Sequence, residues 1–202
     1  MSEEAGIGGA GREASPDGVS PAATPAVPRR PDNLLQFRLG RLLLLLDSLP
    51  EMASAKPLHL ERLGYYDFFA DSPFLVVETD DAVKRRLLLA GFSERSLSYH
   101  SSAQRFTNRR ARLQHDLALL TARGLVEVSA DGKHITFGLT EKGSSLAGKL
   151  KTFYADAFRS SAEIVVRQLN RLSDKALNER AREWLRAEPF LVEIYETGGG
   201  AA

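Results

Sequence analysis

Apolar residues recur at helical spacing through most of this 202-residue chain. A first helix is expected from Asp32 or Asn33, either of which can accept a free backbone N–H as a cap, to about Leu49, before Pro50. A second helix is expected over residues 58–70, after Pro57. The apolar side chains of the two helices are Leu35, Leu39, Leu42, Leu43, Leu46, Leu60, Leu63, Tyr66, Phe68 and Phe69.

The middle of the chain alternates between short and long elements. Residues 74–77 are β-prone and predict a strand, and a third helix begins at Asp80 or Asp81, packs Leu87 and Leu88 inward, and ends at Gly91. A long helix follows over residues 103–123. The apolar stripe of this helix consists of Phe106, Leu113, Leu117 and Leu120. The neighbouring stripe is basic and consists of Arg105, Arg109 and Arg112.

After Gly124, residues 125–128 and 134–139 form two predicted strands around a tight turn, because Asp131-Gly132 supplies the positive φ that a hairpin needs. Thr140 caps a further helix, which breaks near Ser160. Ser173 caps a last helix, which reaches Trp184. Residues 190–195 suggest a final strand.

The order helix, strand, turn, strand, helix is the second half of a winged helix. The sequence therefore predicts a mainly α fold with a small β-hairpin wing, a winged helix-turn-helix-like core and additional C-terminal helices. Residues 91–102 form a loop of about a dozen residues, whereas a simple helix-turn-helix joins its helices by about 3 to 4. The predicted parts are a disordered tail at 1–31, a winged-helix-like domain at 32–143, a helical interaction region at 144–195 and a flexible tail at 196–202.

The net charge of +1 hides an uneven distribution, because residues 81–123 hold nine basic and three acidic side chains. A local positive excess is the footprint expected of a phosphate-binding surface. The chain contains no cysteine and no visible secretory signal, and its run of five leucines at 42–46 is too short to span a membrane. A cytoplasmic protein without membrane contact is expected.

The long helix and the hairpin turn hold the residues suited to DNA. Arginine pairs with guanine edges or phosphate, asparagine can read adenine, and a lysine in the wing adds a backbone contact. The candidates are Arg105, Asn108, Arg109, Arg110, Arg112, Lys133 and His134. The alternative is a solvated arginine face in which Arg112 pairs with Asp116 four residues later.

Clustered aromatic residues suggest a protein interface. Residues 65–69 hold four aromatic side chains and Phe74 adds a fifth; these cannot all face one interior from a helix, so at least one is expected on the surface or under a partner. Trp184, the single tryptophan, is the type of residue that dominates interfaces, although core packing explains it as well. The interface candidates are Tyr65, Tyr66, Phe69 and Trp184.

Signals for catalysis are thin. The four histidines are scattered, and the chain has no H-E-x-x-H, Walker loop or nucleophile elbow. Gly6, Gly8 and Gly11 match G-x-G-x-x-G, but no strand precedes them and no helix follows. We expect a non-enzyme with no catalytic residues, no metal and no cofactor.

Three segments, residues 58–69, 123–126 and 139–143, carry a family resemblance. They are similar to the middle component of bacterial ABC-three-component systems, in which a small winged-helix protein accompanies an SMC-like ATPase, as in Lamassu-type phage defence. The similarity covers about residues 34–150. It implies a non-catalytic subunit that bridges or regulates the ATPase, contacts an effector and helps to grip double-stranded DNA.

Two functions remain open on the sequence. The first is this accessory adaptor, whose partners are an SMC-like ATPase and an effector subunit. The second is a sequence-specific transcription regulator, which would be a homodimer joined through residues 144–187 and would bind half-sites one helical turn apart.

Overall fold

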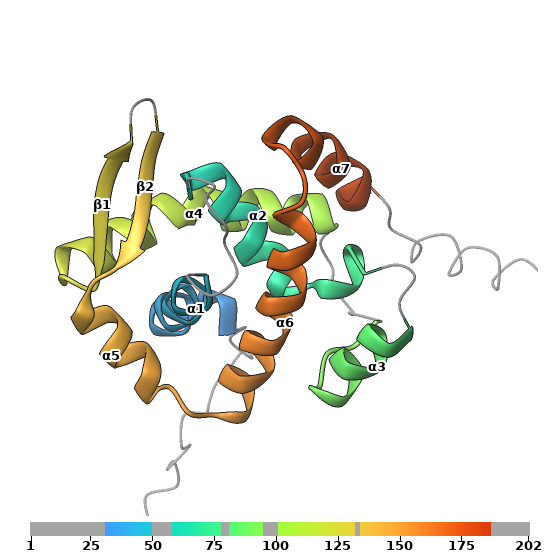
Figure 1. Cartoon of the computed structure of the whole chain (residues 1–202), viewed down its shortest axis with the longest axis horizontal. Helices are drawn as coiled ribbons and strands as arrows, with labels where there is room; N and C mark the ends of the chain where they lie inside the picture. The colour runs from blue at the N-terminus through green and yellow to red at the C-terminus, as the bar shows by residue number, and fades with distance from the viewer. Residues whose placement is uncertain (1–30, 50–57, 78–80, 95–100, 132–133, 187–202) are drawn as a thin grey trace, which may run out of the picture.

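The computed structural model describes residues 31–49, 58–77, 81–94, 101–131 and 134–186. Within these ranges the chain forms seven α-helices, two short 3-10 helices and one two-stranded antiparallel sheet (Figure 1). The predicted mainly α fold with a small hairpin is confirmed. Of the predicted tail at 1–31, Pro31 begins a 3-10 helix and the other residues lie outside the described ranges, as do the tail at 196–202 and the strand at 190–195.

Two helices occupy the centre of the molecule. Helix α1 spans Leu35–Ser48 and α2 spans Leu60–Asp71, and both pack against α4, α6 and the hairpin (Figure 1). All five leucines at 42–46 are buried. A helix enclosed on several sides is apolar around most of its circumference, which explains the uninterrupted leucine run.

The helix starts differ from the expectation in one place. Residue Leu34 occupies the N-cap of α1 without a side-chain hydrogen bond, after a 3-10 turn at Pro31–Asn33, so the predicted Asp32 or Asn33 cap is wrong. In α2 the cap is His59, whose Nδ1 accepts the backbone N–H of Arg62 at 3.2 Å.

The strand expected at 74–77 is also absent. Residues Pro73–Leu75 form a 3-10 helix, and Val76 and Val77 donate their N–H groups back to the carbonyl of Pro73. Helix α3 follows at Asp81–Leu89 and packs mainly on α6. It ends at Gly91, which has φ of 92° and is followed by a bond from Phe92 N–H to Leu87 C=O, as a left-handed helix cap requires.

Helix α4, Ser102–Ala122, leads directly into the hairpin. Its N-cap is Ser101, and Gly124, with φ of 66°, ends it. Strand β1, Val126–Asp131, pairs with β2, His134–Leu139. An isolated bridge between His59 and Thr136 attaches the residue before α2 to the outer edge of β2. Residue His59, directly before α2, therefore lies beside the hairpin.

Three C-terminal helices complete the fold: α5 at Glu141–Lys149, α6 at Phe153–Leu169 and α7 at Asp174–Arg186. Thr140 caps α5 as expected, and Ser173 accepts the N–H of Ala176 at the start of α7. The helical segment is interrupted at residues 150–152, where Thr152 caps α6, and not near Ser160 as predicted. The neighbouring Ser161 is buried, and its hydroxyl donates to the carbonyl of Ala70 at 2.7 Å.

One continuous core joins α1 to α7. Leu177, Ala181 and Trp184 on α7 belong to the same cluster as the leucines of α1, so residues 144–186 pack with the helices that precede them. None of the helices in the described ranges combines the length and the apolar character needed to cross a bilayer.

Candidate functional site

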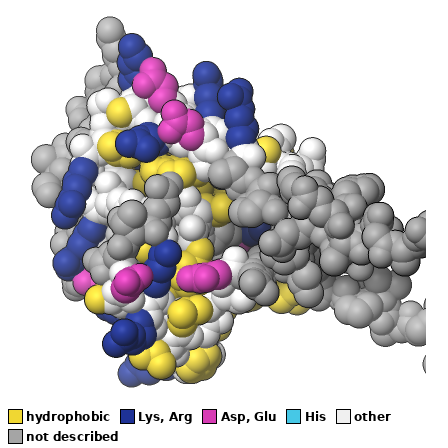
Figure 2. Space-filling view, turned by 90° about the vertical axis from the view of Figure 1, so that its right-hand side faces the viewer, with side chains coloured by type: hydrophobic (Ala, Val, Ile, Leu, Met, Phe, Trp, Pro, Cys, Tyr) yellow, Lys and Arg dark blue, Asp and Glu magenta, His cyan; other side chains and the backbone are white. Residues whose placement is uncertain are grey.

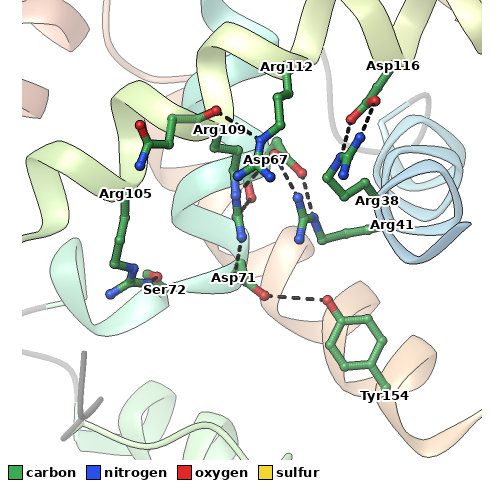
Figure 3. Close-up of polar contacts among 11 residues, drawn as sticks. Arg38, Arg41, Asp67, Asp71, Ser72, Arg105, Arg109, Arg112, Asp116 and Tyr154 are labelled. Atoms are coloured by element: carbon green, nitrogen blue, oxygen red, sulfur yellow. Dashed lines mark hydrogen bonds and ion pairs between the residues drawn. The ribbon is translucent and has the colours of Figure 1, made fainter. Parts of the chain in front are cut away.

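Arginine and aspartate side chains meet between α1, α2 and α4 and form what we call the arginine network (Figure 3). Four arginines and three aspartates take part, and Ser72 and Tyr154 contact its edge. The members are Arg38, Arg41, Asp67, Asp71, Arg105, Arg109 and Asp116. Three of these arginines and aspartates, Arg105, Arg109 and Asp116, come from α4, the helix expected to face DNA.

Asp67 on α2 is the centre of the arginine network. Its Oδ1 accepts Nε of Arg41 at 2.9 Å, its Oδ2 accepts NH2 of the same guanidinium at 3.3 Å, and Nε of Arg109 lies 3.7 Å from Oδ2. The side chains of Asp67 and Arg41 are both buried. Two guanidinium groups therefore neutralise one carboxylate that is shielded from water.

Arg109 points inward, toward α2. Its NH1 donates to the backbone carbonyl of Asp67 at 3.1 Å, and its NH2 donates to Oδ2 of Asp71 at 2.7 Å. The side chain is only 11% exposed and its guanidinium lies 5.6 Å from the centre of the Phe68 ring. In this structure Arg109 is therefore turned away from the surface on which its contact with DNA was predicted.

Arg105, one turn earlier, also points inward. Its NH2 donates to Oγ of Ser72 at 2.8 Å, and its guanidinium lies 5.6 Å from the Phe68 ring on α2. The predicted role of Arg105 in DNA binding conflicts with these contacts. The basic stripe faces α2 because the carboxylates of that helix form ion pairs with Arg109 and the ring of Phe68 makes cation–π contacts with Arg105 and Arg109.

Asp116 pairs with a different helix from the one expected. Nε and NH2 of Arg38 on α1 donate to its two carboxylate oxygens at 2.7 and 2.9 Å. Arg112 instead donates to the carbonyl of Asn108 at 3.1 Å and to Oδ1 of Asn33 at 3.4 Å. The predicted pair between Arg112 and Asp116 is wrong, because the parallel two-bond contact with Arg38 satisfies the carboxylate.

Protonation equilibria inside the arginine network favour its ion pairs. Burial by itself lowers the pKa of Arg41. The negative charges of Asp67 and Asp71 raise it by more than burial lowers it, so the net pKa lies above the usual value. Burial, followed by the charge of Asp71, raises the pKa of Tyr154, whose hydroxyl lies 3.4 Å from Oδ1 of Asp71. The arginine stays charged and the phenol stays neutral at physiological pH, so the arginine network suits rigid support rather than proton transfer.

Two predicted DNA contacts on α4 do reach the surface. Arg110 is 52% exposed and its NH2 lies 3.3 Å from a carboxylate oxygen of Glu61. Asn108 is exposed and accepts from the side chain of Gln104 at 3.0 Å. Lys133 and the side chain of His134 lie outside the described residues.

The four predicted interface aromatics lie in the core, so none of them forms an exposed surface here. Tyr65 stacks on Phe106 with ring centres 5.2 Å apart, and Phe69 meets Trp184 edge to face at 5.5 Å. Tyr66 is buried and its hydroxyl accepts from Arg62 at 3.0 Å. Adjacent aromatics can all be buried here because α1, α4, α6 and α7 surround α2.

Large apolar side chains that the sequence did not single out are exposed instead. Leu88 was expected inside but is 49% exposed, and Leu89 and Phe153 are 80% and 74% exposed. Val128 and Ile135 are exposed on the hairpin. Figure 2 shows hydrophobic side chains gathered at the lower end of the face on which α3 lies, beside Lys and Arg side chains. Within the described ranges, no group of three or more acidic, His or Cys side chains is arranged to hold a metal ion.

Comparison with known proteins identifies the family. A search of curated proteins and a search of solved structures each gave no match. A family model described as "ABC-three component (ABC-3C) system Middle Component 2" matches residues 39–187, which covers every helix from α2 to α7 and most of α1. The chain therefore belongs to the Middle Component 2 family of ABC-three-component systems.

Proposed function

We propose that this chain is a non-catalytic adaptor that joins an SMC-like ABC ATPase to an effector subunit in a bacterial defence system against phage or plasmid DNA. Membership of a family of middle components is the observation that carries this proposal. The partners are contacted through protein surfaces. The chain contributes shape and rigidity, and the ATPase performs the nucleotide chemistry.

The inward arginines support the adaptor role. Arg41 and Arg109 hold α1 and α4 against Asp67 of α2, so the relative positions of three helices are fixed by paired buried charges. A subunit that transmits a conformational change between two partners needs such a stiff frame. On its outside, the hairpin offers the exposed apolar side chains of Val128 and Ile135. Exposed apolar groups of this size favour contact with protein.

DNA contact has a smaller part in this proposal than the sequence implied. Of the arginines in the first half of α4, Arg110 is the one whose side chain is more than half exposed, and Glu61 lies beside it. Single-site phosphate contacts give weak, salt-sensitive and sequence-independent affinity. We place duplex binding with the assembled complex, in which the chain supplements the grip of the ATPase.

The alternative, a sequence-specific transcription regulator, has less support. A recognition helix needs several free side chains that reach base edges. In α4, Arg105 and Arg109 turn inward, and Arg110 is the one arginine among the exposed positions. The exposed positions of this helix are Ala103, Gln104, Thr107, Asn108, Arg110, Ala111, Gln114, His115, Ala118 and Ala122. This exposed surface is better suited to packing against another protein.

The decisive experiment is reconstitution of the three components. The chain would be co-expressed with the ABC ATPase and the third protein encoded beside it, purified through a tag on the ATPase, and sized by light scattering. We expect the chain to remain in the complex at a fixed stoichiometry, and to show no ATP hydrolysis when it is assayed alone.

The regulator hypothesis predicts the opposite pattern. A chain that leaves the ATPase during size exclusion and binds its own promoter as a dimer, in preference to unrelated duplexes, would overturn the adaptor proposal. A matched control is Arg110→Ala, which removes the most exposed arginine of α4. This variant should stay in the complex, since the proposed subunit contacts do not depend on that charge.

A further inference from the structure

An apolar surface at the edge of the molecule has no cover in the described part of the chain. It consists of Leu88 and Leu89 on α3 and Phe153 at the start of α6, and we call it the α3 surface. Figure 2 shows hydrophobic side chains gathered on this side of the molecule. Removing apolar side chains of this size from water is favourable, so an occupant is favoured.

The three side chains of the α3 surface form one patch. A Cβ on Gly91, at the end of α3, would lie 3.2 Å from Cε1 of Phe153, so the phenylalanine ring lies directly against the end of the helix. Leu88 and Leu89 lie less than one turn before Gly91. An occupant can therefore contact the end of α3 and the ring of Phe153 at once.

A basic side chain lies on one side of the α3 surface. Arg85 precedes Leu88 and Leu89 by three and four residues, which places it on the same side of α3. It is exposed, and no carboxylate among the described residues lies within ion-pair distance of it. The next residue, Arg86, is paired with Glu163 at 3.0 Å. The occupant that fits is an apolar segment with carboxylates.

The chain itself contains a segment with this chemistry. Residues 187–202 lie outside the described part of the chain, and residues 188–196 read Glu-Pro-Phe-Leu-Val-Glu-Ile-Tyr-Glu. Five large apolar side chains alternate with or adjoin three glutamates. We propose that residues 188–196 dock on the α3 surface, with their apolar side chains on Leu88, Leu89 and Phe153 and a carboxylate at Arg85.

The direction of α7 places the start of this segment on the correct side. Helix α7 begins beside the hairpin end of the molecule, where Asp174 contacts Arg62 and His59, and His59 bridges to Thr136. It then runs along α2 until Trp184 meets Phe69, near the end of α2. Figure 1 shows the end of α7 and α3 on the same side of the molecule. Ten residues span up to about 33–36 Å when extended, which allows residues 187–196 to cross between the two helices.

Charge also separates this occupant from a second copy of the chain. A two-fold interface places the same patch on both sides, so Arg85 of one copy would lie near Arg85 of the other. Two unpaired guanidinium groups at a buried apolar contact repel each other. The acidic segment avoids this repulsion, because its apolar side chains can cover the α3 surface while one of its carboxylates pairs with Arg85.

Because the chain has no cysteine, disulfide formation tests the proposal in the full-length protein. The test variant is Leu89→Cys with Leu191→Cys, and the matched control is Ile135→Cys with Leu191→Cys, since Ile135 is an exposed apolar residue on the hairpin. At low protein concentration, with oxidised glutathione as the oxidant, the test pair should form the intramolecular disulfide at least about tenfold faster than the control, because docking raises the effective concentration of the two thiols. The readout is the intact mass together with the mobility on a non-reducing gel.

Charge reversal supplies a second measurement on the same background. Arg85→Glu should slow the cross-link several-fold, and Lys149→Glu, which makes the same change of charge at an exposed position of α5, should not. Equal rates for the two cysteine pairs would overturn the proposal. Disulfide-linked dimers of the single variant Leu89→Cys would assign the α3 surface to a second copy, and cross-linking that appears only when the ATPase is present would make the contact a property of the complex; either result overturns the proposal for the free chain.

Discussion

Neighbouring arginines on α4 have opposite surroundings, and this difference decides their roles. Arg109 is held between Asp67 and Asp71, whereas Arg110, the next residue, extends toward solvent beside Glu61. A rotation of about 100° per residue separates them. The sequence alone shows that α4 has a leucine stripe and an arginine stripe, but not which of them is buried. Both can pack against the rest of the protein here, because α2 supplies carboxylates that pair with the arginines.

This difference predicts unequal costs on removal of each side chain. Arg109→Ala removes the hydrogen bonds to the Asp71 carboxylate and the Asp67 carbonyl in a poorly solvated place. Tyr154 and Arg41 keep their contacts with these aspartates, so the variant should lower the free energy of unfolding by about 1.5–3 kcal/mol. Arg110→Ala removes an exposed pair and should cost under about 1 kcal/mol. Urea unfolding followed by circular dichroism measures both. Equal, small losses would mean that the arginine network does not stabilise the fold.

Two glycines of α5 make a second matched pair at the residue scale. A Cβ on Gly143 would lie 2.0 Å from the carbonyl oxygen of Leu125, so the chain must shift, whereas a Cβ on Gly148 meets nothing within 4 Å. Gly143→Ala should destabilise the protein by about 1–3 kcal/mol through overpacking. Gly148→Ala should stabilise it by up to about 1 kcal/mol, because alanine favours the helix.

Thermal unfolding of the two glycine variants would show midpoints on opposite sides of the wild-type value. A Gly143→Ala protein with an unchanged midpoint would mean that α5 does not lie as close to the carbonyl of Leu125, the residue before β1, as this geometry indicates. The carbonyl of Leu125 also accepts the N–H of Thr140 at 3.2 Å, and this hydrogen bond holds the start of α5 against the beginning of the hairpin.

At the scale of elements, local signals predicted the helices well. Thr140, Ser173 and Gly91 end or begin helices where their chemistry requires, and these effects depend on a few adjacent residues. Signals that depend on distant packing failed. Residues 74–77 have β propensity, but the adjoining Pro73 starts a 3-10 turn, and the carbonyl of Val76 accepts from Gln168 on α6 at 2.6 Å. The tertiary contact overrides the local preference.

The junction between α2 and α7 predicts a dependence of stability on pH. Nδ1 of His59 accepts the Arg62 N–H, so the ring proton is on Nε2, which lies 3.3 Å from Oδ2 of Asp174. Burial raises the pKa of Asp174, but hydrogen bonds from Arg62 and His59 together with their charges lower it more, and the net pKa lies below the usual value. A lowered folded pKa means stability that is present above about pH 4 and lost on further acidification.

Asp174→Asn should therefore flatten the acid limb of the stability curve. The measurement is the free energy of unfolding by urea between about pH 2.5 and 6, the range that brackets the ordinary carboxyl pKa, for wild type and variant. A suitable control is Lys175→Gln, which changes the charge of the next residue and leaves the junction intact. Parallel curves for wild type and Asp174→Asn would show that the carboxylate does not hold α7 on α2.

At the scale of the whole molecule, the enclosure of α2 explains most of what sequence missed at the candidate site. The cluster at residues 65–69 would require an exposed aromatic side chain on a surface helix, but α2 has helices on several sides and all four aromatics are buried. Conversely, Leu88 was expected inside yet is half exposed, because α3 packs mainly on α6 and exposes its other side. Which helix lies at the centre depends on the assembled fold and cannot be inferred from local sequence patterns.

The same enclosure limits how the free chain can bind DNA. With Arg105 and Arg109 turned inward, Arg110, Arg112 and Lys133 are the cationic candidates left for phosphate contact. Each contact contributes about −0.9 to the slope of log Kobs against log salt, so duplex binding should have a slope no steeper than about −3. Fluorescence anisotropy of a labelled duplex between about 50 and 200 mM salt measures it, a range over which many phosphate contacts would be evident. Arg110→Ala should reduce the slope by about 1, and a slope near about −5 would show that cations beyond these three candidates contact the DNA.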